Sequence, residues 1–269
     1  MRELRGRFRV REVADWEGLA TILPSIHPTS VVVVDPYRGS DRPADAFWTT
    51  LERFPSAAVV PAFEVRPDRA DHARGMVLAG VSEILNLSRE HTPALAAARV
   101  RSAFARPFKR RIDGALSRHV AVEARTILTA AAEVAVRGGC ANELADMFGV
   151  RGKTLASWCT AHGLPLPRRL LAWLRILLAA HLLEDAGRTR AAVAAACGYR
   201  TDRSLRRIIQ RFVGPRSSSP LFESATRAFN DELRACRDDK RSTATPAHVA
   251  NPMQDNEVQS YPAAAGGAL

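Results

Sequence analysis

Two short segments carry side chains that suit contact with a nucleic acid. Basic and hydroxyl or amide side chains can donate to phosphate oxygens and to the guanine edge in a major groove. The first set of such side chains is Arg151, Lys153, Thr154 and Ser157. The second set is Arg200, Thr201, Arg203, Arg206, Arg207 and Gln210. We take these ten residues as candidate DNA-binding side chains.

Each set lies in a pair of short predicted helices. The predicted helices are 141–148 and 152–162 in the first pair, and 190–197 and 201–212 in the second. The turns contain Gly149 and Gly198, which suit the positive φ of a tight helix-turn-helix. The apolar stripes that would anchor the second helix of each pair are Leu155, Trp158 and Cys159, then Leu205, Ile208, Ile209 and Phe212. Both pairs therefore fit a helix-turn-helix unit.

A long helix is predicted between the two pairs. The segment PRRLLAWLRILLAAHLLED (167–185) begins with Pro167, which suits the first turn of a helix, and is apolar over much of its circumference. At 1.5 Å per residue, about 18 residues give a rod of roughly 27 Å. Such a rod holds two helices near the roughly 34 Å spacing at which successive major grooves face one side of DNA.

The charge distribution agrees with a phosphate-binding surface. The chain has 269 residues and a formal net charge of +11, with the 46% hydrophobic and 25% charged content of a globular protein. Residues 141–216 hold 13 basic and 5 acidic side chains, whereas residues 217–269 hold 5 and 7. A local surplus of this kind is typical of a phosphate-backbone binder. Arginine-rich composition also follows from a GC-rich genome, so the charge carries weight only beside the repeated helix pairs.

With these features the chain resembles the DNA-binding domain of AraC-type transcriptional regulators, which has two helix-turn-helix units joined by one long helix. The resemblance covers about residues 140–216. In GYRTDRSLRRIIQRFVG (198–214) and in the first unit, the matching positions are Gly198, Tyr199, Leu205, Arg207, Ile209 and Gly214, then LADMFGV, Leu155 and Gly163. The sequence departs from the family at Arg203, where serine is usual, at Leu205, where phenylalanine is usual, and in the proline after Gly214, displaced to Pro215 or Pro220. The resemblance implies a double-stranded DNA partner.

The first 105 residues show a different pattern. Strand-like runs at 8–13, 31–34, 57–63 and 82–87 alternate with helix-like runs at 15–23, 45–54, 69–80 and 92–104. Such alternation favours βα units around a parallel sheet. The unbroken VVVV at 31–34 predicts a strand that is covered on both faces.

This N-terminal part resembles a response-regulator receiver domain, which is flavodoxin-like. Asp35 follows VVVV at the place of the phospho-acceptor, and AGVSEILNL (79–87) resembles the segment that leads into the last strand. A receiver's first strand and helix are missing, either lost or excluded by the start codon. The acidic pair that would hold Mg²⁺ is also missing, Pro61 stands at the Ser/Thr place and Leu87 near the Lys place, so the groups that neutralise a transferring phosphoryl group are lacking. We therefore expect Asp35 to be a strand-end or helix-capping residue in a phosphorylation-incompetent, truncated receiver-like domain.

These patterns predict two domains and a tail. An α/β receiver-like domain over 1–110 is followed by an all-α tandem helix-turn-helix domain over 119–236, with a polar linker near 106–118. Residues 237–269 are polar and rich in proline and alanine, which predicts disorder. No run approaches the roughly 18 apolar residues of a membrane span, and no apolar core follows the charged N-terminus. A cytoplasmic protein with reduced, mostly buried thiols and no membrane partner is expected.

Other chemistry finds little support in the sequence. The histidines and four cysteines share no metal-ligand spacing, and neither a GxSxG nor a P-loop is present, so we expect no enzyme activity, metal or cofactor. Trp158 and Trp173 are interpreted as core aromatics. The preferred function is a sequence-specific DNA-binding transcription regulator, with RNA polymerase or a second copy of the chain as a further partner. The alternative is a protein-interaction module whose two degenerate domains serve as docking surfaces, with little DNA binding.

Overall fold

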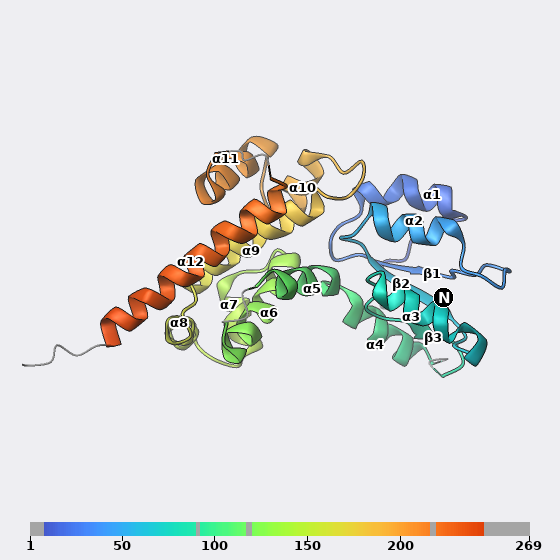
Figure 1. Ribbon diagram of the computed structural model, residues 1–269, viewed down its shortest axis with the longest axis horizontal. Helices are drawn as coiled ribbons and strands as arrows, with labels where there is room; N and C mark the ends of the chain where they lie inside the picture. Colours follow the sequence, from blue (N-terminus) through green and yellow to red (C-terminus); the bar gives the residue numbers. More distant parts are fainter. Residues whose placement is uncertain (1–7, 90–91, 117–119, 216–218, 245–269) are drawn as a thin grey trace, which may run out of the picture.

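The computed structural model describes residues 8–89, 92–116, 120–215 and 219–244. It is mostly helical with one small parallel sheet (Figure 1). The elements up to residue 103, here called the α/β part, are α1 (Trp16–Ile22), a 3₁₀ turn (Leu23–Ser25), β1 (Val31–Val34), α2 (Asp45–Arg53), β2 (Ala58–Phe63), a 3₁₀ turn (Pro67–Arg69), α3 (Ala70–Leu78), β3 (Leu85–Asn86) and α4 (Pro93–Ala103).

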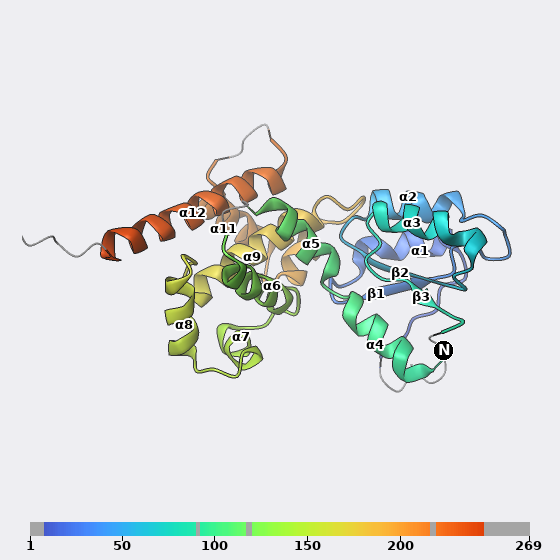
Figure 2. The same ribbon diagram turned by 60° about the horizontal axis from the view of Figure 1, so that its bottom comes forward.

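The sheet has the order β1-β2-β3, and all three strands are parallel. Helices α1, α2 and α3 cover one face and α4 covers the other (Figure 2). On the first face Phe47 and Met76 pack with Val59, and on the second face Ala96 packs with Val60. The α2 and α3 crossovers lie on the same side, as two successive right-handed βαβ connections require.

Two strand predictions in this part are wrong. Residues 8–13 form no strand or helix, because their alternating apolar residues find no neighbouring strand to pair with. The VVVV strand β1 lies at the edge of the sheet, where Val33 is 40% exposed, instead of being covered on both faces. The strand that is buried on both faces is β2, in which only Ala62 is partly exposed. Four consecutive valines can form either an edge strand or a central strand, so the burial of β1 depends on the order of the strands in the sheet.

Asp35 sits directly after β1 and is exposed. Its Oδ1 accepts a hydrogen bond from the Tyr37 backbone N–H at 2.9 Å, so it closes a turn at the strand end. Residues 8–30 contain α1 and no strand. Pro61 lies inside β2, and the residue that follows this strand is Glu64. Neither residue is a Ser or Thr, so the hydroxyl that a receiver carries after this strand is lacking whichever of the two is aligned with it.

The remaining elements form the helical part. They are α5 (Arg106–Ala115), α6 (Val122–Val136), α7 (Ala141–Met147), α8 (Gly152–Ala161), α9 (Pro167–Leu182), α10 (Arg190–Ala196), α11 (Asp202–Val213) and α12 (Leu221–Ala244). One hydrophobic cluster draws buried residues from all eight helices, and the leucine-rich α9 is its centre. Among the helices that the structure describes, none combines the length and apolar character of a membrane-spanning segment.

The structure corrects both predicted borders of the helical part. The segment 106–118, expected to be a polar linker, contains α5, and its Phe108 and Ile112 are 2% and 3% exposed inside the helical core. These two residues are four apart, so they share one face of the helix. Helix α12 continues through Ala244, so residues 237–244 are helical and do not belong to a disordered tail. Residues 245–269 lie outside the described residues.

Candidate nucleic-acid interface

The first predicted unit consists of α7 and α8, which are joined by a short turn. Gly149 between them has φ +65°, and the Val150 N–H donates to the Ala145 carbonyl at 3.1 Å to close the turn. Leu155 and Cys159 of α8 are fully buried, as their spacing predicts. Burial raises the pKa of the Cys159 thiol to about 11, in keeping with a structural cysteine.

The polar face of α8 is open to solvent. All four residues of the first predicted set are exposed, namely Arg151, Lys153, Thr154 and Ser157. Neither of the two cations makes an ion pair with a residue of the described segments. Trp158, predicted to be a core aromatic, is 38% exposed and packs edge-to-face on Phe148 with ring centroids 6.1 Å apart. Trp158 lies about 100° round the helix from Cys159, at the edge of the buried face, where its ring reaches Phe148 on one side and solvent on the other.

The second unit consists of α10 and α11, which are also joined by a short turn. Gly198 has φ +78°, and the Tyr199 N–H donates to the Ala194 carbonyl at 2.8 Å. Thr201 is the N-cap of α11: its Oγ1 accepts from the Ser204 N–H at 3.1 Å, while the Ser204 hydroxyl accepts from the Thr201 N–H at 3.2 Å. Such a reciprocal cap fixes where the helix begins. Leu205 is buried, and the remaining predicted anchors, Ile208, Ile209 and Phe212, pack half-buried on the helical core.

One face of α11 is strongly basic. Arg203, Arg206, Arg207 and Gln210 are exposed at helical spacings of three, four and seven, so they share this face. Arg206 pairs with Asp202 at 2.7 Å. The guanidinium groups of Arg203 and Arg207 make no hydrogen bond or ion pair with any residue that the structure describes. Thr201, the helix cap, and Arg200 complete the second predicted set, and both are exposed.

The two units differ in charge. Residues 189–214 contain six basic side chains and one acidic side chain, whereas residues 141–163 contain two of each. The surplus of the predicted basic region therefore resides mainly in the second unit. An anionic partner would be attracted to α11 before α8.

Helices α9 and α12 hold the second unit in place. Trp173 on α9 is 2% exposed, as predicted for a core aromatic, and its ring lies 4.9 Å from Phe212 of α11 and 5.6 Å from Phe229 of α12. Arg169 on α9 forms an ion pair with Glu232 on α12, and this hydrogen bond lowers the pKa of the Glu232 carboxyl. With 16 residues, α9 is about 24 Å long, slightly shorter than the sequence indicates.

No protein-family model, curated protein or solved structure matches the chain.

A cluster that the sequence did not reveal connects the second unit to the α/β part. Between α9 and α10, Asp185 and Arg188 form an ion pair at 3.0 Å whose side chains are 0% and 2% exposed. Asp185 also accepts hydrogen bonds from the backbone N–H and the hydroxyl of Ser56. Arg188 donates to the carbonyl of Ile26 at 2.9 Å, and the Ala186 N–H donates to that of Arg53 at 2.8 Å. We call this set of bonds the clamp. It fixes the chain immediately before α10 to two segments of the α/β part.

Proposed function

We propose that the chain is a sequence-specific, double-stranded-DNA-binding transcription regulator that places α8 and α11 in successive major grooves. The observation that carries the proposal is the face of α11. It presents to solvent Arg203 and Arg207, which have no ion-pair partner among the described residues. The helix start is capped, its opposite face is packed, and it follows a glycine turn. Arginine donates bidentately to the guanine edge and to phosphate, and residues near the start of a recognition helix point into the groove.

The two helix pairs are proposed to contribute differently to base reading and to backbone attraction. Arg203 lies in the first turn of α11 and Lys153 in the first turn of α8, so these residues read bases. Arg207 lies one turn further along and contacts the phosphate backbone. Because the second unit carries most of the positive charge, it supplies most of the sequence-independent attraction, and the nearly neutral first unit contributes mainly selectivity.

The proposed domain layout is revised by the packing. We place the border just before α5, with an α/β domain over 8–104 and a helical domain over 105–244. Buried hydrophobic residues support this border, since Phe108 and Ile112 of α5 belong to the helical cluster, whereas Ala96 and Ala103 of α4 belong to a cluster of the α/β part. The α/β domain is proposed to be receiver-like and unable to accept a phosphoryl group, and the helical domain to be of AraC type.

Three alanine variants test the proposal on one preferred duplex and one scrambled duplex. Arg203→Ala and Lys153→Ala should each cost about 1 to 3 kcal/mol on the preferred duplex and relax the choice of base. Arg207→Ala should weaken both duplexes by similar factors and reduce the salt slope by about one unit. Arg234→Ala, an exposed arginine on α12 that pairs with Asp231, is the matched control. If the three variants behave like this control, α8 and α11 do not read DNA.

A second candidate function is favoured by the first unit. Trp158 is 38% and Met147 is 46% exposed, so the α7–α8 pair presents two large apolar side chains beside its few charges. Aromatic and methionine side chains are enriched at protein interfaces, which fits the protein-interaction alternative. Trp158→Ala separates the two functions: unchanged DNA affinity with loss of a captured protein partner assigns this surface to protein, and loss of DNA affinity assigns it to DNA.

A further inference from the structure

The clamp attaches the chain before α10 to the C-terminal ends of two helices in the α/β part. Arg188 donates to the carbonyls of Leu23 and Ile26, at 3.4 and 2.9 Å, where the first 3₁₀ turn follows α1. The Ala186 N–H donates to the carbonyl of Arg53, the last residue of α2. Carbonyl groups at the C-terminal end of a helix lack partners within the helix and carry partial negative charge, so a guanidinium and an N–H group suit these positions.

The clamp excludes water. The side chains of Asp185 and Arg188 are 0% and 2% exposed, and Ala186 packs on the hydrophobic cluster that contains Leu19 and Phe54. Hydrogen bonds are directional, and buried ion pairs are screened less than exposed ones. The clamp therefore fixes the orientation of this chain segment as well as its position.

Fixed structure continues from the clamp to α11. Thr189, the residue after Arg188, is the N-cap of α10, and its Oγ1 accepts from the Ala192 N–H at 3.2 Å. Helix α10 ends in the closed turn at Gly198, and the reciprocal cap at Thr201 begins α11. The orientation of α11 therefore depends on how the chain is held before α10.

The packing of the second helix pair on the helical core is shallow. In α10 the buried side chains are one valine and two alanines, and in α11 only Leu205 is buried. Small and half-buried side chains make fewer dispersion contacts than a fully buried leucine. The clamp therefore adds restraint to the pair that the core restrains less.

The first helix pair lies away from the α/β part. Figures 1 and 2 both place α8 on the side of the helical part that is remote from the sheet. Helices α7 and α8 pack on α6, α9 and α12, whereas the clamp residues directly precede α10. The clamp thus acts on one recognition helix, and it influences how α11 is placed relative to α8.

A second attachment fixes the α/β part at the start of α5. Ala105, between α4 and α5, has φ +61° and is 3% exposed. Arg106 pairs with the buried Glu83 at 2.5 Å and donates to the Ser82 carbonyl at 3.2 Å. A residue other than glycine keeps left-handed backbone only where its surroundings hold it, so the border between the two parts is a fixed joint.

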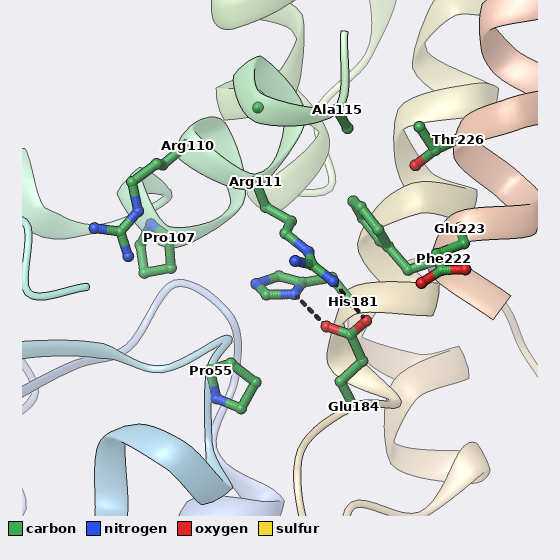
Figure 3. A pocket seen from close by; sticks show the side chains of 11 residues that line it. Pro55, Pro107, Arg110, Arg111, Ala115, His181, Glu184, Phe222, Glu223 and Thr226 are labelled. Carbon is green, nitrogen blue, oxygen red and sulfur yellow. Dashed lines mark hydrogen bonds and ion pairs between the residues drawn. The ribbon is translucent and has the colours of Figure 1, made fainter. Parts of the chain in front are cut away.

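A cavity of about 580 Å³ separates the two parts between these attachments. Figure 3 shows Pro55 on the side of the α/β part, and Pro107 and Glu184 on the side of the helical part. The clamp begins with the residues that follow Pro55 and Glu184, and the second attachment directly precedes Pro107. Because the middle of the interface lacks close packing, the relative placement of the two parts depends on the attachments at its ends.

We infer that Asp185 and Arg188 are positioning residues for DNA recognition. The α/β part braces the helical part between the start of α5 and the chain before α10, and thereby sets the placement of α11 relative to α8. One base pair moves a groove by about 3.4 Å along the duplex and about 35° around it, so rigidly held recognition helices accept one half-site spacing and reject its neighbours. The role in spacing rests on the proposed function, whereas the restraint on α11 does not.

A distance measurement between the recognition helices tests the restraint on the full chain without DNA. Ser157→Cys on α8 and Gln210→Cys on α11 introduce spin labels at two exposed positions. The more accessible native thiols are removed by Cys140→Ser and Cys236→Ser, and the other two cysteines are buried. Pulsed electron paramagnetic resonance then gives the distribution of distances between the labels, whose width reports how firmly α11 is held.

Two clamp variants and one control are compared with this labelled parent. Asp185→Leu with Arg188→Met removes the side-chain bonds of the clamp without leaving a buried charge, so the distribution should broaden. Ser56→Ala removes one hydrogen bond to Asp185 and should broaden it less, and this variant decides the test if the double variant does not fold. The control, Asp231→Leu with Arg234→Met, replaces an exposed pair of the same spacing and should leave the width unchanged. Equal widths in the parent, the folded clamp variants and the control overturn the inference, whether or not DNA binds.

The DNA arm uses the selected duplex with one base pair inserted or deleted between the half-sites. The unlabelled parent should bind the original spacing about tenfold more tightly than either altered spacing, which corresponds to the loss of one bidentate base contact. In the clamp variants this ratio should fall, because the original spacing binds more weakly and the altered spacings do not. A purely stabilising role would lower all three affinities alike and leave the ratio unchanged, and that result overturns the role in spacing. Broadened distances together with no binding of any duplex by the parent overturn the proposed function alone.

Discussion

Removing Asp185 should destabilise the protein strongly. In Asp185→Ala the Arg188 guanidinium stays buried without its carboxylate, and the Ser56 N–H and hydroxyl lose their acceptor. Breaking a fully buried ion pair by removing one partner costs about 3 to 5 kcal/mol, and the lost hydrogen bonds are included in that figure because the terms are not additive. This is a large fraction of the roughly 5 to 15 kcal/mol that stabilises a typical domain.

Urea unfolding followed by circular dichroism measures the effect, and the surface of α12 offers a matched control. Asp231 and Arg234 have the same i,i+3 spacing and the same 3.0 Å distance, but their side chains are 61% and 65% exposed. Asp231→Ala should therefore cost less than about 1 kcal/mol. The double variant Asp185→Leu, Arg188→Met should recover much of the loss, because no buried charge remains unpaired. If Asp185→Ala and Asp231→Ala lose the same free energy of unfolding, the clamp does not hold the two parts together.

Three further predictions concern other parts of the chain. A fragment of residues 105–244 should fold, whereas 119–236 lacks α5 and should be less stable by about 3 to 6 kcal/mol, the worth of two buried side chains, in the same unfolding assay. Asp35→Asn should leave DNA affinity unchanged with or without acetyl phosphate and Mg²⁺, and a phospho-adduct mapped to Asp35 would contradict this. The exposed Cys140 should react with a thiol reagent in the folded protein, whereas Cys197, whose pKa burial raises to about 12, should react only after unfolding. The Cys197 thiol loses its proton at a lower pH in the unfolded chain than in the folded protein, so the free energy of unfolding should fall as the pH rises above the ordinary thiol pKa of 9.0. A free energy of unfolding that does not change in this pH range would refute the burial of Cys197.

The helical elements could be predicted from local patterns. Apolar residues four apart, such as Leu155 and Cys159, mark the packed face of a short helix, and Gly149 marks a turn that needs positive φ. The same rule applies to Phe108 and Ile112 of α5, where charged neighbours favoured the interpretation as a linker. The end of α12 could not be predicted, because its last residues are almost all polar and show no apolar period. A helix that continues from a packed segment needs no apolar face of its own.

The surroundings of the candidate sites could not be predicted in the same way. Ser56 and Asp185 are 129 residues apart, and neither segment carries a sequence motif that predicts a contact with the other. The edge position of β1 follows from strand order, and the exposure of Trp158 follows from which neighbours reach α8. The exposed set on α11 was predictable because polar side chains opposite a packed stripe face solvent wherever the helix lies.

The salt dependence of DNA binding by the full chain tests most directly whether α8 and α11 read DNA. A duplex selected from genomic fragments and its scrambled counterpart are titrated at two or more salt concentrations by fluorescence anisotropy. The logarithm of the affinity for both duplexes should fall linearly with the logarithm of the salt concentration, and the selected duplex should bind about a thousandfold or more tightly than the scrambled one. Equal affinity for the two duplexes, or binding that does not respond to salt, would contradict the claim that α8 and α11 read DNA.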